Sequence, residues 1–314
     1  SPLARLLNYD LDTDGQQVKA HMLGASVTAR HRERYGCTLN QTDHAPLFPF
    51  AASADGFSGH PHDTDVTPAS NANHAPAQHA ETKPALQAAL NTAFAEPPEG
   101  GRNTLAVIVM HRGEVVAEQY GAPVTATTPM QGWSMNKSLM ATFIGRQVDQ
   151  GNLNLDRPVV SALQAAGAGS RTLGKVDPRL TLRHLLSMTT GFDFSERYFP
   201  GDDVTDMLYR QPGMWLSAPD TGHAQPVGKQ WAYSSGDINT ASLVWQQSLL
   251  GESYLHWIQR EFIEPLTLQE IVLEPDASGV QVGSSYAYLT ARDWARMGQL
   301  WLDAWHGRSK VISE

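Results

Sequence analysis

Apolar residues in the middle of the chain fall into short runs whose spacing distinguishes strands from helices. Residues 105–110 form a continuous apolar run of strand length, and a second run at 115–120 follows the polar segment Arg112-Gly113-Glu114. Two such runs joined by a Gly-containing turn predict a β-hairpin in a half-buried sheet. Residues 84–94, just before the hairpin, have a helical pattern.

A longer apolar pattern follows Gly132 and has the period of a helix. Apolar side chains recur between residues 139 and 148 at close to every 3.6 residues, and Gly151 stands where a helix would end. The pattern predicts a buried helix from about residue 134 to 150. A serine and a lysine, Ser134 and Lys137, fall on its first turn.

Further helices are predicted at residues 182–188, 238–250, 253–262 and 291–305. Thr181 and Thr290 stand as N-caps before the first and the last of them. Aromatic residues cluster between residues 192 and 215. We favour the interpretation that they are packing groups over the alternative that they line a substrate pocket. Strands at one end and helices in the middle predict an α/β (α+β) fold, in which an antiparallel sheet is flanked by helices and carries an inserted, mainly helical lobe.

The first eighty residues have a weaker pattern. Residues 8–39 alternate loosely, as at Val18, Ala20 and Met22, and predict one or two strands. From residue 41 to about 83 the composition shifts to Ala, Pro, Ser, Asp, Asn and His, which predicts a linker or a surface arm. We therefore divide the chain into an N-terminal strand segment with a Pro/Ala/His-rich arm, residues 1–83, and a second domain, residues 84–314.

The arm and the single cysteine raise the question of metal binding. Five of the twelve histidines lie in the arm: His44, His60, His62, His74 and His79. Their irregular spacing and the lack of an accompanying cysteine favour a solvated loop over a metal site. Cys37, the only cysteine, permits no internal disulfide and is interpreted as a small buried side chain.

Composition narrows the classes of function. The 314 residues are 41% hydrophobic and carry a formal charge of −9, with Lys and Arg scattered along the chain. Nucleic acid and anionic membranes are therefore disfavoured as partners. No apolar run approaches the roughly 18 residues of a membrane span, and the first residues lack a signal-peptide pattern.

Ser134 and Lys137 form a candidate catalytic pair because residues three apart share one face of a helix. A serine hydroxyl must lose its proton as it attacks a carbonyl, and a neutral lysine within hydrogen-bond reach can accept that proton. The pair alone is a weak signal, since it also arises by chance. Tyr233, in the loop before the helix predicted from residue 238, is a third candidate.

Taken in order, these motifs resemble the serine β-lactamase and penicillin-binding protein superfamily, in particular the branch with class C β-lactamases, esterases and 6-aminohexanoate-dimer hydrolase. Ser134-Met135-Asn136-Lys137 resembles its S-x-x-K motif, and Tyr233-Ser234-Ser235 resembles its Y-x-N or Y-S-S/G element. Flanking segments at residues 151–159, 180–191 and 290–298 are also similar to the family's pattern. The resemblance covers roughly residues 84–314 and implies a β-lactamase/transpeptidase-like serine hydrolase domain.

The resemblance also implies a role for each residue. Ser134 is the expected nucleophile, Lys137 its base and Tyr233 a proton relay to the leaving group. We expect burial beside Tyr233 and the helix N-terminus to disfavour the charged form of Lys137. Trp133 and Ser235 are the expected substrate contacts, and the Ser134 backbone N–H should form part of the oxyanion hole. An acyl-enzyme route of this kind implies no cofactor and no metal.

The sequence departs from the family's pattern after Tyr233. No K-T-G or H-x-G motif stands there, although relatives have their second oxyanion donor on the strand after it. Gly222-His223-Ala224 precedes the tyrosine and is interpreted as a loop. We therefore expect the C-terminal part of the domain to be absent from this chain.

Several alternatives stay open. Ser235 stands where many β-lactamases have asparagine, and its shorter side chain with one donor favours an esterase or amidase over a class C-type β-lactamase or a D-alanyl-D-alanine carboxypeptidase. A non-catalytic member that binds a peptide or glycan is disfavoured because Ser134, Lys137 and Tyr233 are all present. An α/β-hydrolase is disfavoured because Asn136 stands where the second glycine of G-x-S-x-G belongs.

The remaining expectations concern partners and location. We expect a small-molecule ester, amide or β-lactam substrate, no nucleic acid and no membrane span. The oligomeric state is not predicted. A periplasmic or secreted location is expected, and a cytoplasmic one stays open.

Overall fold

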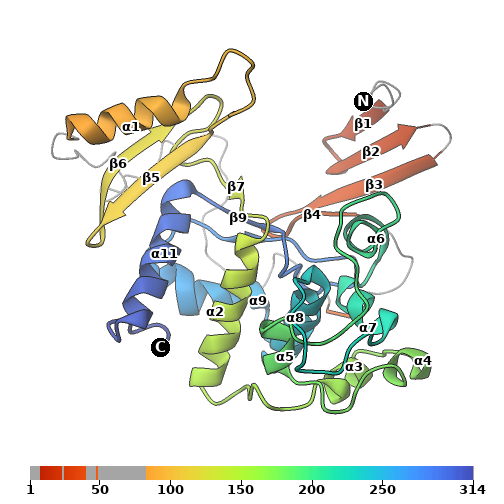
Figure 1. Cartoon of the computed structure of the whole chain (residues 1–314). Helices are drawn as coiled ribbons and strands as arrows, with labels where there is room; N and C mark the ends of the chain where they lie inside the picture. Colours follow the sequence, from red (N-terminus) through yellow and green to blue (C-terminus); the bar gives the residue numbers. More distant parts are fainter. Residues whose placement is uncertain (1–7, 23–24, 40–46, 49–82, 314) are drawn as a thin grey trace.

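The computed structural model describes residues 8–22, 25–39, 47–48 and 83–313, and its strands form antiparallel sheets above a helical body (Figure 1). One sheet is a meander in the order β1-β2-β3-β4, the second is the hairpin β5-β6, and the third has the order β7-β9-β8. The strands are β1 Asn8–Asp12, β2 Gln17–Met22, β3 Ala25–Arg32, β4 Gly36–Leu39, β5 Ala106–His111, β6 Glu114–Tyr120, β7 Met130–Gln131, β8 Val272–Leu273 and β9 Ala287–Leu289.

The meander corrects two predictions. One or two strands were predicted between residues 8 and 39, whereas β1 to β4 lie there. The sequence pattern is weak because the outer strand β1 is exposed throughout, including Tyr9 and Leu11, so apolar and polar positions do not alternate between a buried and an exposed face. Cys37 is the second difference, since it is exposed on β4 and not buried.

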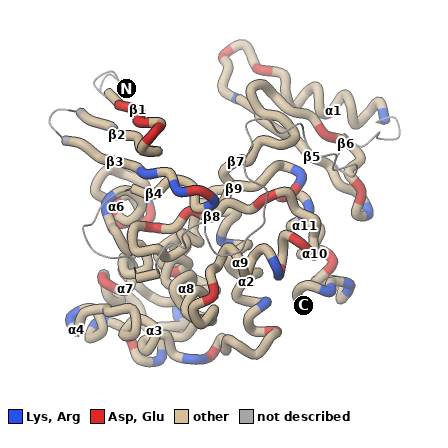
Figure 2. The backbone as a smooth tube through the Cα atoms, turned by 180° about the vertical axis from the view of Figure 1, so that it is seen from behind, with Lys and Arg blue, Asp and Glu red and all other residues tan. Residues whose placement is uncertain are grey.

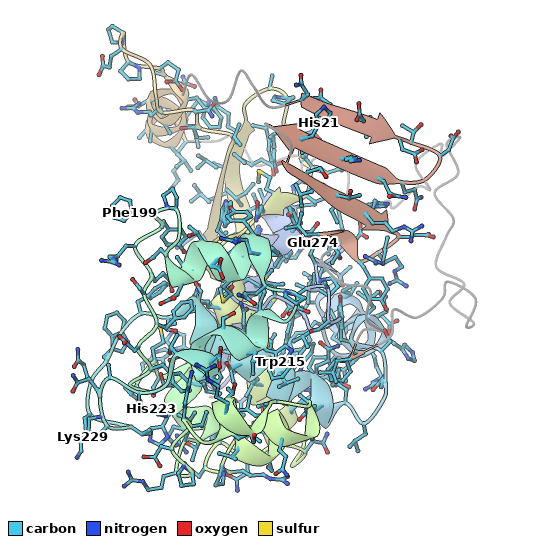
Figure 3. All side chains as sticks on the ribbon, turned by 90° about the vertical axis from the view of Figure 1, so that its right-hand side faces the viewer. His21, Phe199, Trp215, His223, Lys229 and Glu274 are labelled. Atoms are coloured by element: carbon cyan, nitrogen blue, oxygen red, sulfur yellow. The ribbon has the colours of Figure 1, made fainter. Side chains whose placement is uncertain are left out.

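The meander is attached to the body through β4 and the turn before it. The Cys37 backbone N–H donates to Glu274 Oε1 at 2.7 Å, and the Thr38 hydroxyl donates to the Pro275 carbonyl at 3.4 Å. The buried Tyr35 ring meets the Tyr254 ring edge-on, with 5.6 Å between centroids. Figure 3 shows Glu274 directly below the meander, where the two parts meet.

The predicted hairpin and the predicted helix before it are confirmed. Helix α1 spans Pro84–Phe94 and lies along the hairpin (Figure 1). The two turn residues, Arg112 at φ +53° and Gly113 at φ +83°, both have the left-handed backbone that a two-residue hairpin turn requires. Arg292 Nε donates to Glu118 Oε2 at 2.7 Å, and this ion pair fastens β6 to α11.

The helical body contains the remaining elements. They are α2 Met135–Asp149, α3 Val160–Ala165, α4 Ser170–Leu173, α5 Leu182–Leu186, α6 Asp203–Arg210, α7 Ser217–Thr221, α8 Ser235–Ser248, α9 Tyr254–Ile258, α10 Glu264–Leu266 and α11 Ala291–Trp305, with a 3₁₀ turn at Met214–Leu216 and a π turn at Gln259–Ile263.

The predicted helices occur with small shifts in their ends. Helix α11 has the predicted bounds, and Thr290 caps it by accepting the Asp293 N–H. Helix α5 ends two residues early because Met188 has φ +53°. Helix α8 starts three residues early because the Ser234 side chain caps it, accepting the Asp237 N–H at 3.0 Å.

An aromatic cluster joins α2 to the later helices. Phe143 stacks on Trp245 of α8 with 5.4 Å between centroids, and contacts Trp257 and Phe262 at 5.9 and 5.0 Å. All four side chains are buried, and burial of each large apolar side chain stabilises the fold by about 1.5–3 kcal/mol. The cluster therefore fixes α2 against α8, and the first turns of both helices lie at the same site.

The aromatic residues between 192 and 215 divide into two groups. Phe192 and Trp215 are buried, as the packing interpretation predicts, whereas Tyr198 and Phe199 are exposed. Figure 3 shows Phe199 at the edge of the molecule and Trp215 inside the helical body. The exposed pair belongs to the loop that leads into α6.

Basic and acidic residues are interspersed along the backbone (Figure 2). The arm and its five histidines lie outside the described residues except at Leu47 and Phe48, where the Phe48 N–H donates to the Ser278 carbonyl at 3.1 Å. Among the described helices, none has the length and apolar character needed to cross a bilayer.

Candidate active site

Ser134 is the N-cap of α2 and is exposed at the end of a tight turn. The Gly132 N–H donates to the Ala287 carbonyl of β9 at 2.8 Å, which fixes the turn to the sheet. Trp133 follows with φ +47°, a backbone conformation that L-residues rarely adopt. Within the described part of the chain the Ser134 N–H has no hydrogen-bond acceptor, so this donor at the positive end of α2 can donate to a bound group.

Lys137 lies one turn further along α2, and its side chain is 8% exposed. Its Nζ lies 3.1 Å from Ser134 Oγ, 3.0 Å from Ser235 Oγ and 3.0 Å from the Ser284 carbonyl oxygen. As an ammonium group it can donate one hydrogen to each oxygen. As a neutral amine it retains two hydrogens and one lone pair, so one of the three oxygens must face the lone pair.

Ser235 is placed differently from the prediction. As an expected substrate contact it should be accessible, but it is 0% exposed, which leaves it no surface for a substrate to touch. It opens α8, and its hydroxyl lies between Lys137 and Glu196, donating to Glu196 Oε1 at 2.8 Å. Ser235 therefore contacts the lysine and not the solvent.

Tyr233 approaches Lys137 with the face of its ring. The lysine Nζ lies 4.9 Å from the ring centroid, a cation–π distance. The side chain is 41% exposed, and its hydroxyl has no hydrogen-bond partner among the described residues. The structure thus brings Ser134, Lys137 and Tyr233 together, although the ring and not the hydroxyl of Tyr233 contacts the lysine. Trp133 is also exposed beside Ser134, and its substrate contact stays a prediction.

Two buried asparagines position the carbonyl that Lys137 contacts. Asn136 of α2 donates to the Val282 carbonyl at 2.8 Å, and Asn239 of α8 accepts the Ser284 N–H at 3.0 Å. Both helices therefore hold the loop that carries Ser284. Sequence reasoning missed Ser284 because a backbone carbonyl leaves no signature in the residue type.

A second buried network supports the loop that carries Tyr233. Asp237 Oδ1 accepts a hydrogen bond from Ser234 Oγ at 2.9 Å, and Oδ2 accepts one from Thr190 Oγ1 at 2.9 Å. Burial raises the pKa of Asp237 to about 7, against these hydrogen bonds, which favour the carboxylate. The network links the start of α8 to the segment after α5.

His223, which we interpreted as a loop residue, braces that same segment. Its Nδ1 lies 2.9 Å from the Thr190 carbonyl, and its Nε2 accepts the Asp177 N–H at 3.0 Å. The neutral tautomer with hydrogen on Nδ1 satisfies both contacts. The ring also stacks on Phe192, with 4.6 Å between centroids.

No group of three or more His, Cys, Asp or Glu side chains within the described ranges has an arrangement that could hold a metal ion. The groups that contact Lys137 are instead the hydroxyls of Ser134 and Ser235, the Ser284 carbonyl and the Tyr233 ring. Such a set suits nucleophilic attack and proton transfer.

Comparisons with known proteins agree on one family. Residues 79–311 match the Beta-lactamase family. The 6-aminohexanoate-dimer hydrolase of Paenarthrobacter ureafaciens is 24% identical over 211 residues, which are 64% of this chain and 52% of that protein. The chain therefore spans about half the length of this curated relative.

Solved structures show the fold. A Bacillus anthracis protein provisionally assigned as a 6-aminohexanoate-dimer hydrolase has a TM-score of 0.57 and 17% identity, over 73% of this chain and 59% of its own. A penicillin-binding protein from Bacillus halodurans has a TM-score of 0.50 and 17% identity, over 67% of this chain and 72% of its own. These likenesses confirm the predicted β-lactamase/transpeptidase-like fold. Because the family match extends over most of the sequence, the chain belongs to the Beta-lactamase family.

Proposed function

We propose that this protein is a serine hydrolase that cleaves ester or amide bonds of small substrates through an acyl-enzyme. Ser134 is the nucleophile, Lys137 the base and Tyr233 the proton relay. The observation that carries the proposal is the 3.1 Å contact between the buried Lys137 amine and the exposed Ser134 hydroxyl. A base within hydrogen-bond reach of an accessible hydroxyl is the arrangement that nucleophilic catalysis needs.

The first chemical step follows from this contact. Ser134 Oγ attacks the carbonyl carbon of the substrate while its proton moves to the lone pair of neutral Lys137. The Ser134 N–H, unpaired within the described residues, can donate to the oxyanion that forms on the carbonyl oxygen. The proton must then reach the leaving alcohol or amine, and the hydroxyl of the partly exposed Tyr233, whose ring lies over Lys137 Nζ, is the proposed carrier.

A linear amide or an ester is the proposed substrate class. The supporting likeness is to a curated protein named for hydrolysis of the 6-aminohexanoate dimer, a linear amide. Trp133, next to the serine in sequence, and Tyr233, whose ring lies over Lys137 Nζ, are exposed and offer apolar surface for such a substrate. β-Lactam hydrolysis is the alternative that the same machinery would support.

Covalent labelling tests the proposal. A fluorophosphonate probe should label the purified protein, and Ser134→Ala should abolish the labelling. Ser138→Ala is a matched control, because Ser138 is an exposed serine one turn further along α2 and should be dispensable. Lys137→Ala should slow the labelling by roughly 10²–10⁴-fold, the usual contribution of a general base.

Substrate kinetics separate the classes. We expect turnover of a p-nitrophenyl ester and of a linear 6-aminohexanoate dimer to exceed that of nitrocefin. Nitrocefin turnover far above both would identify a β-lactamase. Labelling that persists in Ser134→Ala, or wild-type protein that no acylating probe labels, would contradict the serine hydrolase proposal.

A further inference from the structure

Glu196 accepts hydrogen bonds from Ser235 through both carboxylate oxygens. Its Oε2 accepts the Ser235 backbone N–H at 2.6 Å, and its Oε1 accepts the Ser235 hydroxyl at 2.8 Å. Oε1 also accepts the Tyr198 hydroxyl at 2.9 Å, and desolvation raises the pKa of Tyr198 to about 12, so that this phenol keeps its proton at neutral pH. Three donors thus face a group that, as a carboxylate, can only accept.

This arrangement fixes the direction of the Ser235 hydroxyl. A serine has one O–H hydrogen, and here that hydrogen lies on the bond to Glu196. The contact between Ser235 Oγ and Lys137 Nζ, 3.0 Å long, must then have Ser235 as the acceptor and the lysine as the donor.

The direction of the Ser235 hydroxyl decides which oxygen faces the lone pair of a neutral Lys137. A carbonyl oxygen can only accept, so the Ser284 carbonyl takes one lysine hydrogen, and Ser235 takes a second. A neutral amine has no third hydrogen. Its lone pair is left for the one remaining contact, Ser134 Oγ at 3.1 Å.

We propose that Glu196 is a positioning residue that reserves the Lys137 lone pair for Ser134 by holding the Ser235 proton; this inference rests on the proposed function. In the step concerned, the Ser134 O–H bond breaks and its proton goes to the Lys137 lone pair. Ser134 Oγ forms the bond to the substrate carbonyl carbon, whose π electrons move to the oxygen. Glu196 touches no reacting atom.

The substitution Glu196→Gln should reverse the direction of the Ser235 O–H bond, and it keeps the size and shape of the side chain at position 196. The Ser235 N–H can only donate, so the glutamine oxygen must face it and the NH₂ group must face Ser235 Oγ. The Ser235 hydrogen then turns to the lysine lone pair. We expect the acylation rate constant to fall at least about tenfold, with KM within about twofold of wild type, because the proton acceptor and not the binding surface is lost.

A double-mutant cycle separates this role from a merely structural one. Ser235→Ala removes the hydroxyl but keeps the backbone N–H that Glu196 also holds. Adding Glu196→Gln to Ser235→Ala should therefore change the rate by less than about twofold. Asp203→Asn is the matched control, since it removes one charge near the same loop and its amide oxygen can still accept the Ser195 N–H.

The outcomes decide the inference. A Glu196→Gln rate within about twofold of wild type overturns it, as does an equal loss in both backgrounds, which would show a structural effect through the Ser235 N–H. Should Glu196→Gln not fold, Glu196→Ala serves as the second variant, because it too frees the Ser235 hydrogen to turn toward Lys137 and should show the same loss.

Proton positions provide a test that needs no activity. Neutron diffraction of the deuterated protein should place the Ser235 deuteron between its Oγ and Glu196 Oε1. A deuteron between Ser235 Oγ and Lys137 Nζ would overturn the inference. A wild-type protein that forms no acyl-enzyme, with the deuteron on the Glu196 side, would instead count against the proposed function alone.

Discussion

Gly132 stands where the chain turns into α2, and the neighbouring indole leaves no room for a side chain. A Cβ built there would lie 2.1 Å from Cζ2 of Trp294, far inside contact distance. Trp294 is itself fixed, because its Nε1–H donates to the Met130 carbonyl at 3.3 Å. The turn that presents Ser134 is therefore shaped by packing two residues before the proposed nucleophile.

We expect Gly132→Ala to displace this turn. Overpacking of this kind costs typically about 1–3 kcal/mol of unfolding free energy. The displacement should also slow fluorophosphonate labelling of Ser134, because the distance to Lys137 Nζ depends on the same turn. Urea denaturation and labelling kinetics measure the two effects.

Gly145→Ala is the control for this prediction. Gly145 lies in the same helix, and a Cβ there would meet nothing within 4 Å. A glycine-to-alanine change inside a helix should stabilise the protein by about 0.5–1 kcal/mol and leave labelling unchanged. If both variants behaved alike, the contact with Trp294 would not be what shapes the turn.

The site residues that could be predicted from the sequence are those whose partners are close to them in the chain. Ser134 and Lys137 are three residues apart, so helix geometry alone predicts that they meet. Glu196 bonds to a residue 39 positions away, and the Ser284 carbonyl to one 147 positions away. Such long-range contacts depend on tertiary packing, which residue spacing does not encode.

At the scale of elements, the start of α8 depends on a buried acid. Asp237 is buried, and it joins the cap residue Ser234 to Thr190 beyond α5. Desolvation disfavours its charged form and raises its pKa to about 7, whereas the pKa of an aspartate in the unfolded chain is about 3.9. The native and unfolded states therefore bind different numbers of protons between about pH 4 and pH 7.

This difference predicts a pH dependence of stability. Between about pH 4 and 7 the native state keeps a proton on Asp237 that the unfolded state has released, so the free energy of unfolding falls as pH rises. The slope approaches about 1.4 kcal/mol per pH unit, and the contribution is fully present only below about pH 4. Asp237→Asn should lack this term, so the wild-type value minus the mutant value should decrease across the range.

Denaturation at a series of pH values measures this difference, and Asp156→Asn controls for it. Asp156 is exposed, and hydrogen bonding to Arg183 lowers its pKa, so its small contribution should have the opposite sign and disappear as pH falls below about 4. A wild-type minus Asp237→Asn difference that stays constant between pH 4 and 7 would show that burial does not shift this group.

A helix or strand could be predicted where its own sequence has both a regular spacing of apolar residues and a residue that marks its end. Helix α11 has an apolar stripe and the cap Thr290, and its observed bounds equal the predicted ones. Strand β1 has only Tyr9 and Leu11 as apolar residues on an exposed edge, so the pattern that identifies strands is nearly absent. The segment at residues 253–262 was predicted as one helix, but a π turn from Gln259 interrupts it.

At the scale of the molecule, the meander meets the body at β4 and at the turn before it, where Cys37, Thr38 and Tyr35 contact Glu274, Pro275 and Tyr254. The pairings inside the meander are between consecutive strands, whereas the hydrogen bonds of Cys37 and Thr38 to the body each join residues 237 positions apart. Gly36, the first residue of β4, has φ +69°, and a Cβ there would lie 2.5 Å from Glu274 Oε1. Nothing in the sequence of residues 8–39 indicates where on the body this sheet docks.

The buried Tyr35 ring is an apolar part of this junction, and its removal should loosen the meander as a unit. Tyr35 is 7% exposed and packs edge-on against Tyr254. Truncation of a buried aromatic residue to alanine typically costs about 3–5 kcal/mol. We expect Tyr35→Ala to speed amide hydrogen exchange in β3 and β4, while amides in α2 and α8 keep their protection, because a sheet whose strands pair with one another can open as a local unit.

Tyr9→Ala distinguishes loss of the junction from loss of any aromatic residue. Tyr9 belongs to the same sheet but is 71% exposed, so its truncation removes little buried surface and should leave exchange in β3 and β4 nearly unchanged. Hydrogen exchange read by mass spectrometry resolves these segments. If Tyr35→Ala exposed α2 and α8 as much as the meander, the sheet would be an integral part of the core of the helical body. If it changed neither, the hydrogen bonds to Glu274 and Pro275 would be sufficient to hold the sheet in place.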